Sequence, residues 1–488
     1  MLGCSALLWE PWAGLDIYAE KGIYFYKQGF KEDKALAFLH KEKHDTDMTQ
    51  GSIARLLLAF AIPLMVGNLF QQLYNTVDSL IVGNFVGKQA LAAVGCTGPI
   101  INTLIGLFSG LAAGASVVIS QYYGAKDEEK LGKAVHTTVL LTLAACLVLT
   151  AIGVWATPLM LRLMDTPEDV IGEAAVYLRI YFGGVSGLLL YNIGSGILRA
   201  VGDSTRPLYF LIFSAFLNTG LDLLFVAVLH MGIAGAAIAT ILSQFISAAL
   251  VLLLLLRSKE PYRLCLNQLQ ISTGMLRRIC NIGIPSSLQM GITAFSNVFV
   301  MGYINHFESS CMAGWTAYNK LDALAMLPMQ SLSLALTTFV GQNLGAGDLN
   351  RAKAGPRYGV LMGMALMLLI IVPLMIFAPQ LTALFNAEAE VVAFGTLFVR
   401  LCSPFYLAFA INQVYSGALR GAGDTRPTMF FMLGSFVVFR QLYLFVVSRF
   451  GAGPGIIALG YPVGWVLCSA LLLVYYYRGK WIKKLNLN

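Results

Sequence analysis

The chain has 488 residues, of which 57% are hydrophobic and 12% charged, and its formal net charge is +8. A soluble globular chain carries roughly 25% charged residues, so this composition argues against a soluble multidomain protein. Apolar runs of about 20 residues recur from Leu56 almost to Tyr477, and each is long enough to cross a bilayer as a helix.

The cysteines and the charge limit the partners that we expect. The eight cysteines include no CxxC motif and no Cys/His pair at metal-ligand spacing, so neither disulfides nor a zinc site are predicted. We expect no cofactor and no metal beyond a coupling Na⁺. We expect small-molecule substrates and the lipid bilayer as partners of a monomeric chain, and no nucleic acid.

The first residues of the chain precede any apolar run. Residues 1–48 mix aromatic and charged side chains and lack the unbroken apolar core of a signal peptide. Met48 resembles a natural start of the chain, and the Thr49–Ser52 segment that follows it resembles the N-terminal cap of a helix. We interpret 1–48 as a disordered extension or the product of an upstream start site.

Twelve membrane-spanning helices are predicted in chain order. The first six cover 53–83, 89–121, 132–156, 170–200, 205–228 and 233–256. The second six cover 279–305, 311–343, 354–378, 391–419, 427–449 and 455–477.

The basic residues predict an orientation. Lysines and arginines crowd the connections on one side of the helices, whereas the opposite side holds Lys88, Arg162 and Arg449. The side rich in lysine and arginine is normally cytoplasmic, so both termini are expected in the cytoplasm of a multi-pass protein of the plasma (inner) membrane.

An internal repeat is the strongest signal. The segment SGILRAVGD at 195–203 recurs as SGALRGAGD at 416–424, with six of nine positions identical, and the same offset relates SQYYGA at 120–125 to GQNLGA at 341–346. Two parallel repeats of six helices are typical of transporters with a central cleft. We therefore predict an all-α integral membrane fold of twelve helices in two six-helix repeats around a central cleft.

The repeat sets the predicted domain boundaries. A first lobe covers 49–257, a cytoplasmic linker 258–278, a second lobe 279–478 and a cytoplasmic tail 479–488.

Four stretches in the first half carry a family resemblance: QQLYNTVDSLIVGNFVGKQALAAVG, SQYYGAKD, LRAVGDSTRP, and NTGLDLLF followed by GIAGAAIAT. In this order, and with the duplication, the chain resembles the multidrug and toxic compound extrusion (MATE) family over about residues 50–480. The resemblance implies a secondary active transporter, not an enzyme.

The first predicted helix carries a polar stripe. Gln71, Tyr74 and Asp78 fall on one helical face, which Pro63 continues. A charge at the membrane centre costs about 2.5 to 3.5 kcal/mol, so Asp78 needs a functional reason. Pro63 removes a helical hydrogen bond and is predicted to be a hinge.

The fifth and sixth helices complete a predicted cation site. Asn218 and Asp222 share one face of the fifth helix, and Thr240 lies midway along the sixth. Two carboxylates with amide and hydroxyl oxygens suit a hard monovalent cation or a shared proton. The resemblance assigns Asp78, Asn218, Asp222 and Thr240 to cation binding in the branch with a site in the N-terminal lobe.

The second half lacks this chemistry. The position matching Asp78 lies near Val300 and Met301, and Arg440 falls in the register of Asn218 to Asp222. Lys320 and Asp322 are intramembrane but two residues apart, so they are predicted to point in different directions. The candidate residues of a substrate cleft are Gln71, Tyr74, Asn192, Lys320, Asp322 and Arg440.

The repeated LRAVGD and LRGAGD segments are interpreted as turns, because Gly202 and Gly423 can end a helix. Asp424 lies in a GAGD motif like that of intramembrane aspartyl proteases, but no YD partner precedes it. The predicted function is export of small amphipathic, often cationic, drugs or toxins in exchange for Na⁺ or H⁺. The alternative is a lipid-linked saccharide flippase of the same superfamily.

Overall fold

Long helices make up the computed structural model, which describes residues 47–164, 166–479 and 481–482, with the backbone alone for Pro99 and Val298. No strand occurs within these ranges. The extension predicted for 1–48 lies outside them apart from Asp47 and Met48.

The first half runs from α3 to α9. Its helices are α3 (Ile53–Phe85), α4 (Lys88–Gly124), α5 (Glu128–Leu163), α6 (Glu168–Gly183), α7 (Val185–Ala200), α8 (Thr205–Asp222), the π-helical segment Leu223–Val228 and α9 (Gly232–Arg257).

The second half follows a short 3₁₀ turn at Leu266–Gln268. Its helices are α10 (Thr273–Ile304), α11 (Ser309–Gly345), α12 (Leu349–Ile376), α13 (Ala378–Ala383), α14 (Ala389–Cys402), the 3₁₀ turn Ser403–Phe405, α15 (Tyr406–Gly421), α16 (Thr425–Leu433), the π-helical segment Gly434–Phe439, α17 (Arg440–Arg449), α18 (Pro454–Ala458) and α19 (Gly460–Tyr477).

These helices confirm the predicted all-α fold. Ten helical stretches are long and apolar enough to cross a membrane, and α6 with α7 forms an eleventh that bends by 47°. The 32-residue α10 completes the twelve, although its sequence is less apolar. Because α10 begins at Thr273, the last residues of the predicted linker 258–278 are helical.

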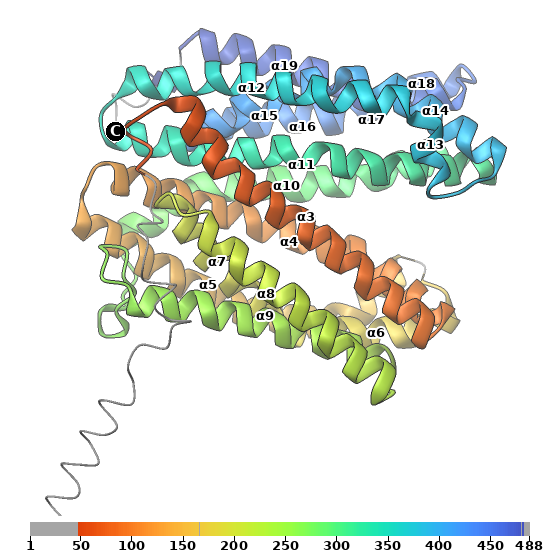
Figure 1. Cartoon of the computed structure of the whole chain (residues 1–488), viewed down its shortest axis with the longest axis horizontal. Coiled ribbons are helices and arrows are strands. Elements are labelled where there is room, and N and C mark those ends of the chain that lie inside the picture. Colours follow the sequence, from red (N-terminus) through yellow and green to blue (C-terminus); the bar gives the residue numbers. More distant parts are fainter. Residues whose placement is uncertain (1–46, 165, 480, 483–488) are drawn as a thin grey trace, which may run out of the picture. The chain divides into compact units, whose positions relative to one another are not determined.

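The helices gather into two bundles that follow the two halves of the sequence (Figure 1). In the first bundle α9 packs against α7 and α8, and in the second α11 packs against α14 and α15. Contacts between the bundles come from α4 with α10 and from α11 with α3 and α4.

Glycines bring α4 and α10 unusually close together. Gly110 and Gly114 lie four residues apart on one face of α4, and a Cβ atom at Gly110 would overlap the backbone of Ser287. A Cβ atom at Gly114 would lie 2.5 Å from the backbone nitrogen of Gly283 and would overlap it too. Small residues at such spacing allow membrane helices to pack backbone to backbone, so this contact joins the two lobes along α4.

The first helix belongs to both bundles. Leu57 and Phe60, before Pro63, pack in the hydrophobic cluster of the second half. Ile81 and Val82, after Pro63, pack in the cluster of the first half. The proline therefore lies where α3 passes from one lobe to the other.

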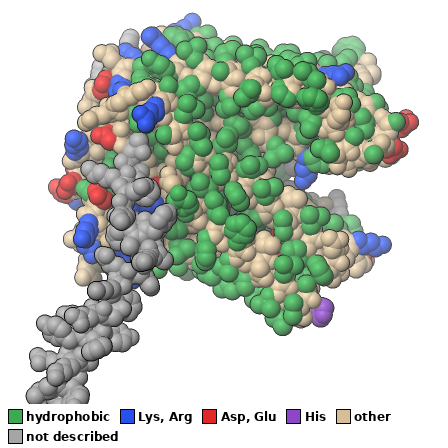
Figure 2. All heavy atoms as spheres, viewed as in Figure 1, with side chains coloured by type: hydrophobic (Ala, Val, Ile, Leu, Met, Phe, Trp, Pro, Cys, Tyr) green, Lys and Arg blue, Asp and Glu red, His purple; other side chains and the backbone are tan. Residues whose placement is uncertain are grey.

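The surface has the pattern of a membrane protein. Figure 2 shows a broad apolar face over the middle of both bundles, with charged side chains gathered mainly at the end where α3 begins. We call this the basic end. At the opposite end the surface is hollowed between the two bundles (Figure 2).

Candidate functional site

The predicted acidic residues meet inside the first lobe. Asp78 comes from α3, and Asn218 and Asp222 come from α8, which packs directly against α3. Asp78 is 8% exposed, Asn218 1% and Asp222 0%. Three polar side chains have therefore been removed from solvent at one contact between helices.

The end of α8 sets the position of Asp222. Asp222 is the last α-helical residue, and the π-helical segment Leu223–Val228 follows it. A π-helical turn inserts extra backbone into the helix and occurs often at functional sites. The change from α-helical to π-helical geometry therefore comes directly after Asp222, whose carboxyl group faces that of Asp78.

The oxygens of this group need a further partner. Oδ1 of Asp78, both carboxyl oxygens of Asp222 and both polar atoms of Asn218 are buried and form no hydrogen bond with a described residue. The two carboxyl groups are near enough to share a hydrogen bond if one of them carries a proton. Ionised carboxylates accept but cannot donate, so a proton or a cation is required between them.

Aromatic hydroxyls surround the acids. Tyr74 on α3 and Tyr177 on α6 lie within electrostatic range of both Asp78 and Asp222, and Tyr181 lies beside Tyr177. Thr240 is buried on α9, the helix packed beside α8, and forms no hydrogen bond with Asp78 or Asp222. Tyr74 belongs to the predicted polar stripe, whereas Tyr177 and Tyr181 were not predicted, because residues on another helix carry no local sequence signal.

A cavity of about 520 Å³ adjoins the acids and reaches both lobes. Its walls include the predicted Pro63, Gln71, Tyr74 and Asn192. Asn218 borders the same cavity, whereas Asp78 and Asp222 are not among its lining residues. Pro63, Gln71 and Tyr74 of the predicted stripe therefore face the cavity.

A second cavity, of about 480 Å³, lies in the second lobe and contains the predicted Asp322 and Arg440. Asp322 accepts hydrogen bonds from Tyr406 (2.7 Å) and Tyr318 (3.2 Å). Arg440 donates to Ser296 (2.8 Å) and stacks over the ring of Tyr461.

Lys320 differs from the other candidates. It is exposed and is not among the lining residues of either described cavity. Asp322, in contrast, lines the second cavity.

Sequence reasoning missed two cavity residues. Gly202 and Gly423 have positive φ values of 100° and 78°, as expected for the predicted turns. Arg199 and Arg420, a few residues earlier, line the first cavity. The local pattern indicates a helix end and does not show that this end faces a cavity.

Repeat-related hydrogen bonds close the structure at the basic end. The side-chain amide of Gln121 donates to the carbonyl of Gly421 (3.0 Å), and that of Gln342 donates to the carbonyl of Ala200 (2.9 Å). Gln121 matches Gln342, and Ala200 matches Gly421, in the sequence repeat. Each half therefore donates an equivalent glutamine hydrogen bond to the other, as an approximate two-fold axis between them requires.

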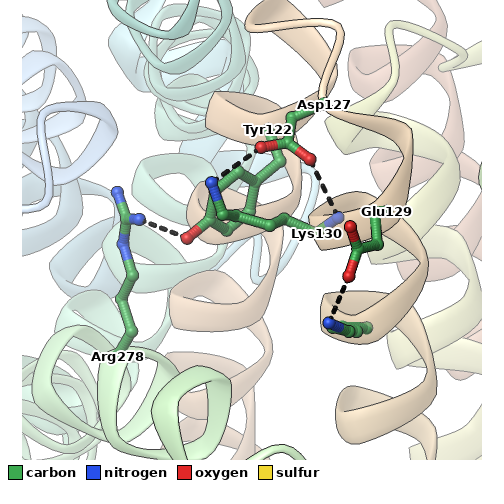
Figure 3. A network of polar contacts seen from close by, with 6 residues as sticks. Tyr122, Asp127, Glu129, Lys130 and Arg278 are labelled. Carbon is green, nitrogen blue, oxygen red and sulfur yellow. Dashed lines mark hydrogen bonds and ion pairs between the residues drawn. The ribbon is translucent and has the colours of Figure 1, made fainter.

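Further polar contacts support each glutamine. Arg278 donates to the side-chain oxygen of Gln121 (2.6 Å). It also donates to the hydroxyl of Tyr122 (2.6 Å), as Figure 3 shows. In the other half the backbone N–H of Met48 donates to Gln342 (3.1 Å).

The turn after α4 is stabilised by an ion pair and a backbone hydrogen bond between two of its neighbouring residues. Asp127 accepts from the ammonium group of Lys130 (2.8 Å) and from its backbone N–H (3.0 Å), as Figure 3 shows in part. These bonds hold the pKa of the Asp127 carboxyl below its usual value. The turn thus fixes the start of α5 beside the glutamine contacts.

Pro63→Ala is expected to slow transport several-fold while leaving substrate affinity almost unchanged. Alanine restores the missing backbone N–H and stiffens α3 where it passes between the lobes. Turnover and KM in proteoliposomes measure the two effects separately. Wild-type turnover in this variant would show that Pro63 serves packing and not bending.

Comparisons with known proteins give a consistent result. The MatE family model matches residues 63–224 and 285–446, once in each half of the repeat. The chain is 33% identical over 436 residues to the probable multidrug resistance protein YpnP of Bacillus subtilis, covering 89% of this chain and 97% of that protein. It is 32% identical over 447 residues to the probable multidrug resistance protein YoeA of the same organism, covering 89% and 95%.

A solved structure supports the fold. It is described as the outward-facing conformation of a multidrug resistance MATE family transporter of the MOP superfamily. The TM-score is 0.84 at 23% identity, with 92% of this chain and 100% of that chain covered.

Proposed function

Because this chain belongs to the MatE family of membrane transporters, we propose that it is an antiporter that exports small amphipathic molecules in exchange for Na⁺ or H⁺. The observation that carries the proposal is the buried pair Asp78 and Asp222, whose oxygens need a proton or a cation between them. The first cavity, which adjoins this pair through Asn218, is the proposed path of the substrate.

The pair can link ion and substrate through the shape of α3. A bound cation or proton removes the repulsion between Asp78 and Asp222, and so favours the arrangement in which α3 and α8 are in contact. Loss of the ion favours their separation. Because α3 also packs in the second lobe, this change acts on the contact between the lobes.

The orientation is part of the proposal. The basic end is placed in the cytoplasm of the plasma membrane, in agreement with the excess of lysine and arginine in its connections. The glutamine contacts then close the cytoplasmic side, and the hollow between the lobes faces outward.

The flippase alternative is not favoured. The family model that matches this chain is that of the MatE transporters, and the relatives named above are probable multidrug resistance proteins.

Efflux from proteoliposomes under separately imposed ion gradients tests the proposal. A tenfold gradient of the coupling ion is worth about 1.4 kcal/mol, so one-for-one exchange can sustain a substrate ratio of up to about ten. We expect either a Na⁺ gradient or a pH gradient to drive accumulation to this level. The proposal would be contradicted if the substrate concentrations inside and outside the proteoliposomes stayed equal under the Na⁺ gradient and also under the pH gradient.

A further inference from the structure

The two cavities carry more positive charge than the sequence predicted. Among the described residues that line the first cavity, Arg199 and Arg420 are the charged ones, and no carboxylate lines it. The second cavity also includes Arg420 and shares Met290, Gln330 and Leu334 with the first, so the two spaces adjoin. Its Asp322 is already paired with two tyrosine hydroxyls.

The repeat places the two arginines in equivalent positions. Each lies in the last turn of its helix, Arg199 on α7 and Arg420 on α15. Each directly precedes the carbonyl, of Ala200 or of Gly421, that accepts a hydrogen bond from a glutamine of the other half. The guanidinium groups therefore approach the cavity from both lobes, beside the contacts that close the basic end.

Neither arginine forms an ion pair with an acid in the described part of the chain. Arg420 is 6% exposed, and across the described ranges neither guanidinium takes part in an ion pair or a hydrogen bond. The side chain of Tyr191 lies within electrostatic range of Arg199. The C-terminal helix dipole stabilises a cation at each position, but among the described residues the N–H donors of each guanidinium have no hydrogen-bond acceptor.

We propose that Arg199 and Arg420 bind the acidic group of the transported molecule, so that the preferred substrates are small amphipathic organic acids. A planar guanidinium offers paired N–H donors that match the oxygens of a carboxylate or phosphate. Apolar and amide side chains of the same cavity, such as Leu211, Met290 and Asn68, surround the rest of the molecule. This inference rests on the proposed export function and replaces the expectation of mainly cationic substrates.

The position of the arginines also connects binding with the closed basic end. An anion held between Arg199 and Arg420 draws α7 and α15 towards each other. The carbonyls of Ala200 and Gly421 then stay near the glutamines that bind them. Release of the anion removes this attraction.

Equilibrium binding of two dyes to the purified full-length protein tests the proposal without any ion gradient. Fluorescein and rhodamine 123 share a xanthene ring system but carry opposite charge. We expect the wild-type protein to bind fluorescein about tenfold more tightly than rhodamine 123, as one charge-assisted contact would give. A preference for rhodamine 123, or the absence of saturable fluorescein binding, would overturn the proposal.

Variants assign the preference to the two arginines. Arg199→Gln and Arg420→Gln are each expected to weaken fluorescein binding about tenfold without weakening rhodamine 123 binding. Arg420→Lys keeps the charge and is expected to retain most of the affinity. Arg179→Gln is the control, because Arg179 is exposed and lines neither described cavity. Equal fluorescein affinity in the wild type and both glutamine variants would contradict the assignment.

A lipid phosphate has the same chemistry as a soluble acid, and a competition experiment separates the two. Fluorescein binding is measured in nanodiscs of phosphatidylcholine and in nanodiscs containing phosphatidylglycerol. We expect equal affinities. Displacement of fluorescein by phosphatidylglycerol in the wild type, but not in Arg420→Gln, would assign the arginines to a lipid headgroup and overturn the proposal. Because binding needs no gradient, a failure of antiport would leave these results unchanged.

Discussion

Asp78→Asn is expected to reduce ion-driven efflux to the level of protein-free liposomes, while the protein stays folded and inserted. Asparagine is neutral, so it does not incur the cost of about 2.5 to 3.5 kcal/mol of a buried charge, and we expect α3 to stay stable in the membrane. It does remove one of the two carboxylates that are proposed to hold the coupling ion. Efflux of a fluorescent substrate under an imposed ion gradient measures the loss.

Two further variants make this result specific. Asp222→Asn is expected to match Asp78→Asn, and the double variant should be no worse than either, because the two carboxyl groups act as a unit. Asp169→Asn is a matched control at the exposed start of α6 and should transport at the wild-type rate. Full transport by Asp78→Asn would remove Asp78 from the coupling site.

Gly124→Val is expected to prevent closure of the basic end and to lower transport strongly. A Cβ atom at Gly124 would overlap the carbonyl of Gln342, and one at Gly345 would overlap the carbonyl of Gln121. Overpacking costs about 1 to 3 kcal/mol, which lowers the population of the closed state by roughly 5- to 150-fold. Gly345→Val should have the same effect, since the repeat places it in the same contact.

Spin labels can measure this closure directly. Exposed positions Lys133 and Asn350 lie on different lobes near the basic end. In a cysteine-free background, labels at these positions should be farther apart in Gly124→Val than in the parent protein. Gly132→Ala is the control, because a Cβ atom there meets open space. Unchanged distances and transport in Gly124→Val would show that this glycine contact does not control closure.

Periodicity and duplication made most of the fold predictable. Runs of apolar residues gave the twelve helices, and the repeated LRAVGD and LRGAGD segments gave the two halves. The face shared by Gln71, Tyr74 and Asp78 followed from helical spacing. Each of these signals is local or is a direct copy within the sequence.

The site residues and helix contacts that the sequence did not predict depend on contacts between distant segments of the chain. Tyr177 lies near the acids because α6 packs against α4 and α9 in the same bundle, and no spacing within α6 shows this. Arg199 and Arg420 resemble ordinary basic residues at helix ends, where they are favoured by the helix dipole. Their place in the cavity is visible only in the folded chain, where residues of both helix ends line the same space. The glycine contact of α4 with α10 likewise needs both helices to be seen together.

The central claim is that Asp78 and Asp222 exchange a cation for the exported molecule. The most direct test records cation uptake and substrate efflux together in the same proteoliposomes, using radioactive Na⁺ in one set and an internal pH dye in the other. We expect one of the two cations to enter in step with efflux, in fixed ratio, and this uptake to disappear in Asp78→Asn and Asp222→Asn. Sustained wild-type efflux with no accompanying entry of either cation would contradict the claim.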